Sequence, residues 1–498
     1  MHKMCAEMEV IMGKEKSIGK RKFYERKFLK GLLMFGIVTA AAVTIFTQTD
    51  NALAAKKKIK QSDDCVTMSL KKDVLTVKGK GEMGDPIETT IYEEKIIKKV
   101  VVKKGVVSLP KNAFQGCKEL KKVILPGTLK KIGARAFANS GVEEINIPKS
   151  VQSIGAEALS NTKIKSIALP KTLKELGVYV FYGCKKLDNI TMPGKIKNIE
   201  SVYSECEYDY LPRAFYGGTS HSLKKVKFTT AIDFDIVSRV AQSQNFQVAA
   251  NDSKYKSVDG MIYTKNGKTL VGIPYGRKKI VISDKCTAVS TKSYWYGIET
   301  QWKWGEIIFP NTITKVIDEW NGEFFDYGYT GDTYASNKKE IKVILNMKYL
   351  DRDSIKNLWQ SNSRWRNSLK DELIRKGLAK LNEENERMLM LEDGYLCSYL
   401  VKEGVDINNY KTWEIVSRLV IPDNVKTIGS GAFTQCYVRS LILGSGVMYI
   451  EDNSIQAEPD EEPEAYTGST KIYVKRPDIS ISDNAFINGD KVKVIIEQ

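Results

Sequence analysis

Histidine is almost absent from this chain of 498 residues, which holds only His2 and His221. A Ser-His-Asp triad or a Cys-His pair would therefore have to use His221, and a zinc site built from several histidines would lack its ligands. The sequence also contains no C-x-x-C pair of the kind that binds zinc. These gaps argue against a histidine- or metal-dependent enzyme, and we expect neither a cofactor nor a metal.

The cysteines do not form a disulfide framework. Seven of the eight follow residue 54, and an odd number leaves at least one thiol unpaired. Cys117, Cys184 and Cys436 each come three residues after a phenylalanine, and Ser140 and Thr162 occupy the equivalent place elsewhere. A position that accepts Cys, Ser or Thr requires a small side chain, so we expect these cysteines to be buried and inert.

Long apolar runs are scarce, and the most prominent lies near the start. The run GLLMFGIVTAAAVTIF at 31–46 follows a basic stretch and precedes Ala52-Leu53-Ala54. A charged segment, a short apolar segment and an Ala-x-Ala site together predict a signal peptide over 1–54, and hence a secreted or cell-surface protein. The alternative is an uncleaved membrane anchor. The basic segment is long, so Met12 is an alternative start of translation.

Positive charge dominates, with 77 Lys and Arg against 60 Asp and Glu and a net charge of +17. The first 54 residues contribute nine basic and five acidic residues, which leaves a net charge of +13 on the remainder. Export argues against a nucleic-acid partner. Lysines scattered through a sequence usually form a solvated face, and attraction to anionic wall polymers or acidic host glycans is the alternative.

Nearly the same phrase recurs along the chain. Residues 125–137 read LPGTLKKIGARAF, and residues 147–159 read IPKSVQSIGAEAL. Proline, glycine and aromatic or leucine positions all repeat every 22 to 23 residues: Pro126, Pro148, Pro170 and Pro193; Gly133, Gly155 and Gly177; Phe114, Phe137, Leu159 and Phe181. A unit this short cannot bury its own apolar face, so the repeats predict a solenoid whose stacked coils bury one another.

Each repeat has an interpretable internal order. Alternation in VEEINIP predicts a short strand, and Pro148 ends it because proline has no N–H for a ladder. Gly155 is expected where a side chain would clash or where φ is positive. The phenylalanine of the A-x-A-F segment is expected to pack beneath the next coil. We count about eight or nine such coils, with degraded copies between the clear ones.

The assembled motif, LxxIxIPxxVxxIGxxAFxxC, resembles that of the BspA-like leucine-rich-repeat family of bacterial cell-surface proteins. The segment VTMSLKKDVLTVKGKGEMGD at 66–85 is similar to the β-structured opening of many members, and VDGMIYTKNGKTLVGIP at 258–274 resembles a hairpin carried between their repeats. The resemblance implies a solenoid displayed outside the cell that binds partners, in some members host matrix proteins or other microbes. The ligand does not follow from the repeat alone.

Together these observations predict a β-rich leucine-rich-repeat solenoid (α+β) of stacked 22–23-residue coils, with an N-terminal β cap and a helical insertion. The expected divisions are a signal peptide (1–54), the β-structured cap (55–95), leucine-rich repeats (96–228), irregular repeats with a hairpin and an aromatic insertion (229–350), a helical insertion (351–392) and C-terminal repeats (393–498).

Residues that do not fit the repeat are the candidate ligand-binding residues. One insertion, at 202–212, alternates acidic and aromatic residues, and a second aromatic-rich insertion follows Tyr294. Such aromatics anchor protein interfaces or stack on sugars, although they also serve merely to pack an irregular loop. The candidates are Tyr203, Tyr208, Tyr210, Trp302, Trp304, Tyr327, Tyr329 and Tyr334.

The predicted function is extracellular protein binding or adhesion, with an extracellular protein or glycan, such as a host matrix glycoprotein, as the partner. Contact with a membrane is expected only through the N-terminal segment, if it is not cleaved. Carbohydrate recognition through the aromatic insertion is the alternative. A carboxylate-based glycan hydrolase, using the Glu205, Glu207 and Asp209 cluster, is the less favoured one.

Overall fold

The computed structural model describes residues 57–60, 66–84, 97–199, 223–240, 243–274, 276–290, 305–317, 341–360, 366–402, 414–433, 436–456, 470–487 and 492–496. The chain divides into one unit of residues 1–58 and 69–72 and a second unit of the remaining residues. Strands β1 (Lys57–Lys60) and β2 (Thr67–Lys71) lie at this division, and every element from β3 onward belongs to the second unit. Within the described ranges, no helix has the length and apolar character needed to cross a membrane.

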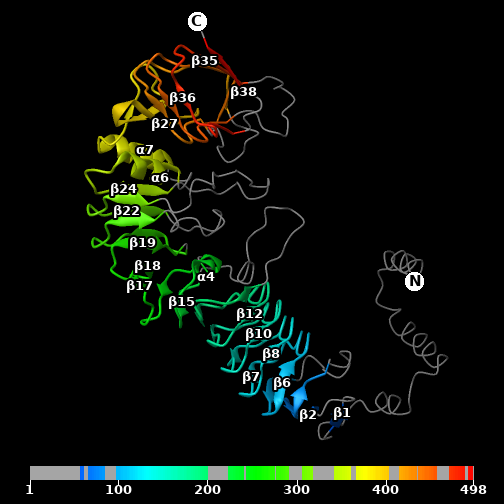
Figure 1. The fold of residues 1–498 in the computed structure, drawn as a ribbon. Coiled ribbons are helices and arrows are strands. Elements are labelled where there is room, and N and C mark those ends of the chain that lie inside the picture. Colours follow the sequence, from blue (N-terminus) through cyan, green and yellow to red (C-terminus); the bar gives the residue numbers. More distant parts are fainter. Residues whose placement is uncertain are drawn as a thin grey trace, which may run out of the picture. The chain divides into compact units, whose positions relative to one another are not determined.

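The second unit is a β-solenoid of about 13 stacked turns with few helices (Figure 1). The count exceeds the eight or nine coils expected from the motif, because degraded copies also form coils. Each coil contributes one strand to a main ladder of parallel strands: β3 (Val74–Lys78), β5 (Lys99–Val102), β7 (Lys122–Ile124) and β9 (Glu144–Ile145), then β11 (Ser166–Ala168), β13 (Asn189–Met192), β15 (Lys225–Phe228) and β16 (Phe246–Gln247).

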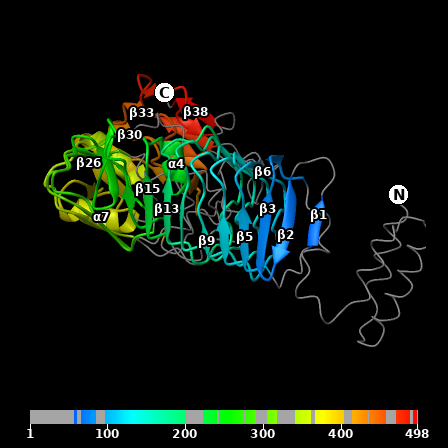
Figure 2. The same cartoon turned by 90° about the horizontal axis from the view of Figure 1, so that it is seen from below.

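A second ladder of shorter parallel strands runs through the same coils. It follows the order of the sequence: β4 (Gly81–Glu82), β6 (Val106–Leu109), β8 (Lys131–Ile132), β10 (Ser153–Ile154), β12 (Glu175–Leu176) and β14 (Asn198–Ile199). Figure 2 shows the strands of these coils side by side. Pairing between β15 and β16 carries the main ladder on to residue 247.

Turns complete each coil and add further hydrogen bonds between coils. Arg135 and Glu157 adopt left-handed backbone conformations, each with φ of 55°. Their amides donate to carbonyls of the next coil, from Arg135 N to Ala156 O and from Glu157 N to Val178 O, both at 2.8 Å. Non-glycine residues with positive φ are uncommon, and here the bonds to the next coil offset the strain.

Small residues behind the phenylalanines are buried, as expected. The Ser140 hydroxyl donates to Phe137 O at 2.7 Å, and the Thr162 hydroxyl donates to Leu159 O at 2.9 Å. The Cys184 thiol occupies the same position in the next coil and also reaches Leu159 O, at 3.1 Å. Ser, Thr and Cys are interchangeable here because each is small and brings one hydrogen to a buried carbonyl.

The segment at 255–276 forms a three-stranded antiparallel sheet. Its strands are β17 (Tyr255–Val258), β18 (Met261–Thr264) and β19 (Thr269–Gly272). The expected Asn-Gly turn joins β18 to β19, and a second tight turn at Asp259-Gly260 adds β17. Parallel pairing of β19 with β21 (Ala288–Ser290), followed by β23 (Lys315–Ile317), returns the chain to the solenoid. The main-ladder strands here are β20 (Lys279–Val281), β22 (Glu306–Phe309) and β24 (Lys342–Leu345).

Residues 351–392 are not helical throughout. Helices α6 (Arg352–Gln360) and α7 (Arg366–Arg375) are followed by β25 (Lys380–Leu381) and β26 (Met388–Leu391). Serines of the helices accept backbone hydrogen bonds from strand edges, Ser354 from Val316 of β23 at 2.8 Å and Ser368 from Val343 of β24 at 2.9 Å. The helices therefore cover the last strand of each sheet, which would otherwise present unpaired groups. A discrete helical insertion and an N-terminal β cap stay predictions.

The C-terminal coils begin at a hairpin. The 3₁₀ turn η5 (Glu392–Gly394) joins β26 to β27 (Tyr395–Tyr399), which starts the next parallel sheet with β30 (Thr427–Ile428), β33 (Tyr449–Ile450) and β36 (Ser480–Ile481). The remaining main-ladder strands are β29 (Leu419–Val420), β32 (Ser440–Ile442), β35 (Thr470–Val474) and β38 (Val492–Ile496). Two-stranded sheets pair β28 (Glu414–Val416) with β31 (Cys436–Val438) and β34 (Ile455–Gln456) with β37 (Phe486–Ile487). Earlier in the chain, helix α4 (Phe234–Arg239) lies between β15 and β16 in sequence.

Of the two reasons expected for glycine at position 155, a side-chain clash applies and a positive φ does not. A Cβ at Gly155 would lie 2.6 Å from Ala134 N of the preceding coil, whereas one at Gly127 would meet nothing within 4 Å. We therefore expect Gly155→Ala to lower the free energy of unfolding by about 2 kcal/mol, because the coils must separate locally. Gly127→Ala serves as the control and should unfold as the parent does. Urea unfolding followed by circular dichroism measures both, and equal midpoints would contradict the close-approach argument.

Candidate binding surface

The ligand-binding residues predicted from sequence lie outside the described residues. This applies to all eight aromatics (Tyr203, Tyr208, Tyr210, Trp302, Trp304, Tyr327, Tyr329 and Tyr334) and to the carboxylates Glu205, Glu207 and Asp209. Their roles therefore stay predictions. Among the described residues, two kinds of feature bear on function: groups that could perform chemistry and surfaces that could hold a partner.

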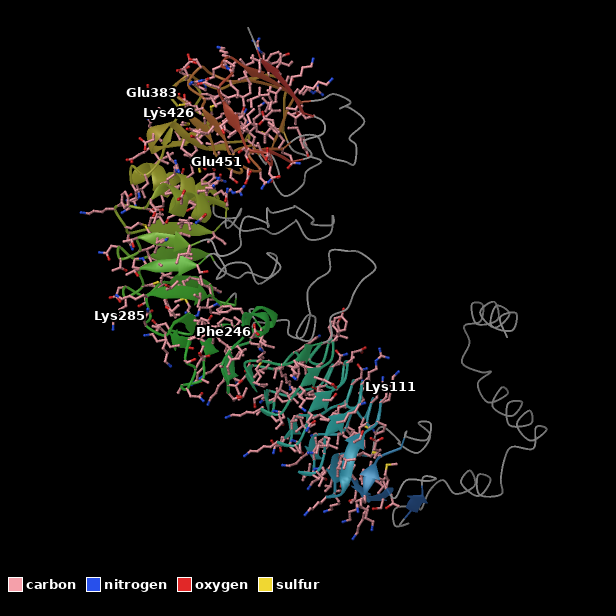
Figure 3. The ribbon with its side chains drawn as sticks, viewed as in Figure 1. Lys111, Phe246, Lys285, Glu383, Lys426 and Glu451 are labelled. Carbon is pink, nitrogen blue, oxygen red and sulfur yellow. The ribbon has the colours of Figure 1, made fainter. Side chains whose placement is uncertain are left out.

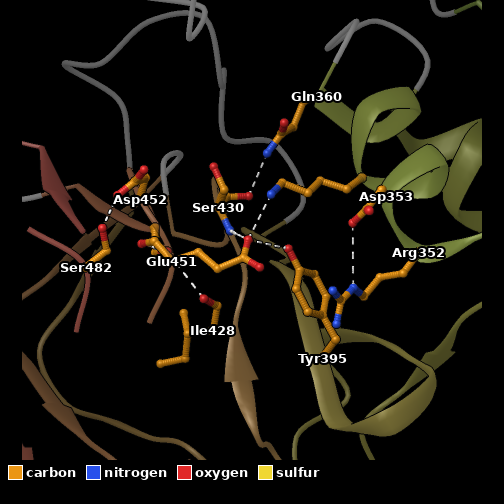
Figure 4. A network of polar contacts seen from close by, with 11 residues as sticks. Arg352, Asp353, Gln360, Tyr395, Ile428, Ser430, Glu451, Asp452 and Ser482 are labelled. Atoms are coloured by element: carbon orange, nitrogen blue, oxygen red, sulfur yellow. Dashed lines mark hydrogen bonds and ion pairs between the residues drawn. The ribbon is translucent and has the colours of Figure 1, made fainter. Parts of the chain in front are cut away.

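A network of polar contacts surrounds Glu451, which follows β33 (Figure 4). Its Oε2 accepts hydrogen bonds from Lys356 Nζ of α6 at 2.9 Å, from the Tyr395 hydroxyl at 2.8 Å and from Ser430 N at 3.1 Å. Gln360 of α6 adds a bond from its side-chain amide to Ser430 O at 2.7 Å. These contacts join the helices to the C-terminal coils.

The electrostatics of this network favour a fixed charge over an acid–base catalyst. Burial opposes the charge of Glu451, but the Lys356 hydrogen bond and charge outweigh burial and hold the pKa of the carboxyl below its usual value. Burial, followed by the charge of Glu451, raises the pKa of Tyr395. The carboxylate stays ionised and the phenol stays neutral at neutral pH, which suits a structural clamp.

The described thiols are equally unreactive. Cys184, Cys286, Cys397 and Cys436 are free thiols, and all four are buried, as is Cys117. Burial raises the pKa of Cys397 and of Cys436 to about 12, so neither forms a thiolate nucleophile at neutral pH. Among the described residues, no group of three or more His, Cys, Asp or Glu is placed to hold a metal ion.

A row of apolar side chains instead faces solvent on the main ladder of the C-terminal coils. The row follows the strand register from Val420 to Ile442, Tyr473 and Ile495. Inward neighbours Leu441 and Ile472 are fully buried, whereas Val420 is 50% exposed and Ile495 is 36% exposed. Strand pairing spaces such neighbours about 4.8 Å apart, so the row is a continuous apolar stripe. We call it the C-terminal apolar row.

Basic residues border this row. The outward position two residues earlier holds Ser440, Lys471 and Lys493 in register on β32, β35 and β38, and both lysines are exposed. An apolar stripe with a cationic margin is the arrangement of a protein interface with a polar rim. It fits a partner whose own apolar residues are bordered by acidic ones.

The same repeat position is apolar in the middle coils. Val281, Ile308 and Ile344 follow one another in register on β20, β22 and β24, and Val281 is 51% exposed. In the coils between β9 and β15 this position holds Ala168, Thr191 and Lys227 instead. These rows were not predicted from the sequence. Their signal is the middle residue of the I-x-I strand segment, which is apolar in the later copies and also at Val101 and Ile124 of the first coils.

The family comparison matches part of the chain. A model described as the BspA type leucine rich repeat region matches six copies, over residues 85–208 and 408–461. These ranges take in most of the first ladders and the start of the C-terminal coils. A comparison with curated protein sequences gives no match.

Solved structures of bacterial repeat proteins are also similar to the chain. A leucine-rich repeat protein from Eubacterium ventriosum is 14% identical, with 87% of this chain and 94% of that chain covered and a TM-score of 0.35. A leucine rich cell surface protein from Faecalibacterium prausnitzii is 14% identical, with coverage of 81% and 92% and a TM-score of 0.30. The pneumococcal vaccine antigen PcpA is 11% identical, with coverage of 89% and 99% and a TM-score of 0.27.

The network around Glu451 gives a prediction for stability. We expect Glu451→Gln to lower the free energy of unfolding at pH 7 by about 2 kcal/mol, because charge-assisted hydrogen bonds are lost. The folded pKa of Glu451 is depressed, so its stabilisation is present above the unfolded pKa and is lost as the pH falls through the folded pKa. The difference between parent and variant should therefore shrink below about pH 4.

Glu383→Gln provides the control, because Glu383 is exposed on the surface (Figure 3). Its unfolding should match that of the parent at every pH. Chemical denaturation at pH 7, 5 and 3.5 measures the three proteins. A Glu451→Gln variant as stable as the parent at pH 7 would contradict the clamp.

Proposed function

Because this chain is a BspA-type leucine-rich-repeat protein, we propose that it acts outside the cell as a binding or adhesion protein and holds a partner protein on the C-terminal apolar row. The single observation that carries the proposal is the register of Val420, Ile442, Tyr473 and Ile495, four outward apolar residues on consecutive coils, of which Val420 and Ile495 are exposed and the other two half-buried. Contiguous apolar patches of this kind are characteristic of interaction sites.

The physical basis of binding is preorganisation. The side chains of the row stand on paired strands, and their backbone atoms are already fixed by inter-strand hydrogen bonds. A partner therefore loses little of its binding free energy to ordering this surface. Tyr473 is the expected anchor, since tyrosine combines a large apolar ring with a hydroxyl that tolerates water.

Secretion by the predicted signal peptide over 1–54 belongs to the same proposal. It is supported by the apolar run at 31–46 and by the family of the repeats. A repeat scaffold displayed outside the cell gives an apolar row access to extracellular proteins. Carbohydrate recognition through Trp302 and Trp304 is retained as the second candidate, on the strength of their clustering in the sequence.

We expect the full chain to bind at least one purified extracellular-matrix glycoprotein, and Ile442→Ser/Tyr473→Ser to weaken that binding about tenfold or more, as loss of central interface residues does. Val101→Ser/Ile124→Ser is the matched control, because these residues are paired outward neighbours on β5 and β7 and Ile124 is 40% exposed. The control should bind as the parent does in surface plasmon resonance at physiological salt.

Two results would overturn this proposal. Binding unaffected by the row variant but abolished by Trp302→Ala/Trp304→Ala would assign the site to the aromatic insertion. An absence of binding to every glycoprotein tested would contradict matrix adhesion itself.

A further inference from the structure

The positive charge of this protein is concentrated in its first coils. Residues 97–199 hold 20 Lys and Arg and six Asp and Glu, a net charge of +14, whereas the whole chain has +17. The scattered, solvated lysines expected from sequence therefore give way to a local accumulation. Its distribution within each coil is also uneven.

One connection of each coil carries lysines alone. The five connections that lead from β5 to β6, β7 to β8, β9 to β10, β11 to β12 and β13 to β14 contain no Asp or Glu. All of their lysines are exposed, and we call them the basic edge: Lys103, Lys104, Lys130, Lys149, Lys171, Lys174, Lys195 and Lys197. Stacked backbone bonds hold them in order, from Gln152 N to Lys130 O and from Lys174 N to Gln152 O, both at 2.8 Å.

The opposite connection of the same coils differs. It leads from the second ladder back to the main ladder, and its basic residues are interspersed with Glu119, Glu143, Glu157 and Asp188. Ion pairs form there, including Arg135 with Glu157 at 2.6 Å. That side carries eight basic and four acidic residues, so its net charge of +4 is half the +8 of the basic edge.

Later coils do not continue the basic edge. Two equivalent connections contain no charge, at 310–314 and 443–448, and others mix opposite charges, with Asp284 beside Lys285 in one and Arg476 bonded to Asp478 at 2.5 Å in another. Within the part of the chain that the structure describes, the only ion pair of the basic edge joins Lys195 to Asp233 at 3.9 Å, where the edge ends next to α4. The edge is therefore a bounded array of one sign.

The geometry of the array defines the partner. Five coils at about 4.8 Å spacing place eight ammonium groups along roughly 20 Å. Hydroxyls fix the loops that carry them: Ser150 donates to Leu129 O and Thr172 donates to Lys149 O, both at 2.6 Å. A straight, rigid row of like charges matches a linear polyanion that runs along the stack of coils.

The residue types narrow the class of polyanion. The basic edge has no arginine fork, and its connections contain no aromatic residue that could stack on a base. It has no exposed apolar anchor either, because Leu129, Val151 and Leu173 are buried. Recognition therefore rests on point charges at close spacing, which suits a chain with several anionic groups per repeat better than a chain with a single carboxylate.

We propose that the basic edge binds a linear, highly sulfated polysaccharide. Sulfate esters remain ionised at every physiological pH, and their oxygens accept hydrogen bonds from ammonium groups in any orientation. Flexible lysine side chains on a fixed backbone can therefore reach successive sulfates along the polysaccharide. This site is separate from the C-terminal apolar row and stands whether or not that row holds a protein.

Heparin is the probe, measured against the full chain by surface plasmon resonance from 50 to 300 mM NaCl. We expect saturable binding, and the logarithm of the association constant should fall linearly with the logarithm of the salt concentration. The variant Lys130→Gln/Lys149→Gln/Lys171→Gln/Lys174→Gln should bind heparin about tenfold or more weakly, because each removed lysine removes a counterion-releasing contact. Since these lysines are exposed, circular dichroism and thermal unfolding should be unchanged.

The matched control removes four charges from the opposite connection: Lys111→Gln/Lys118→Gln/Lys163→Gln/Lys185→Gln. All four are exposed, and Lys111 is labelled in Figure 3. The control should keep heparin affinity within about threefold of the parent, since distant exposed charges are screened. An equal loss in both variants would show that only net charge matters and would overturn the site.

Competition with heparin by other polyanions identifies which chemical groups the basic edge binds. Fully desulfated heparin keeps the sugar chain and its carboxylates, and it should fail to compete. Competition by desulfated heparin as strong as by heparin would overturn the role of sulfate. Binding of polyphosphate or single-stranded DNA as tight as that of heparin, and equally sensitive to the edge variant, would overturn the assignment to a polysaccharide.

Discussion

The backbone hydrogen bonds between consecutive coils are the interaction on which the rest of this structure depends. They occur in both ladders and also in the turns, where left-handed residues such as Arg135 and Glu157 donate to the next coil. Because strand pairing fixes the distance between coils, every position of the repeat becomes a straight row. Equivalent side chains of consecutive coils therefore point to the same side, inward or outward. One outward row can be apolar, basic or mixed in charge while the neighbouring rows differ from it.

Close spacing also determines which residues the repeat can accept. Gly155 and Gly177 lie so near the preceding coil that a Cβ would collide with backbone atoms. Phe114 and Phe137 fill the interior by stacking at 5.3 Å between ring centroids. The same constraint makes the ends of a ladder costly, because they leave unpaired strand edges. Serine side chains of α6 and α7 accept hydrogen bonds from the edge strands of two sheets. The Glu451 network then joins α6 to the next coils.

The sequence predicted the solenoid well because its evidence was periodic. Pro126, Gly133 and Phe137 each belong to a series that recurs at the coil length, and a series survives the loss of single members. The count of coils was less accurate, since degraded copies such as that of β35 keep the strand without the motif. The helical insertion over 351–392 stays a prediction, and the place of α6 and α7 on the strand edges depends on contacts between residues far apart in sequence, such as Ser368 with Val343.

The candidate surfaces were harder to predict for a physical reason. Sequence reasoning looks for residues that depart from the repeat, and it therefore selected insertions such as that containing Trp302 and Trp304. The apolar row and the basic edge contain ordinary repeat residues whose significance appears only across coils. Ile442 is unremarkable in its own strand, and Lys149 is one lysine among many. Stacking turns each into a member of a row about 4.8 Å from the next, so in a solenoid the unit of recognition is a repeat position followed through several coils. A search for sites in such chains should therefore compare equivalent positions, because a partner that runs along the stack contacts one position of every coil.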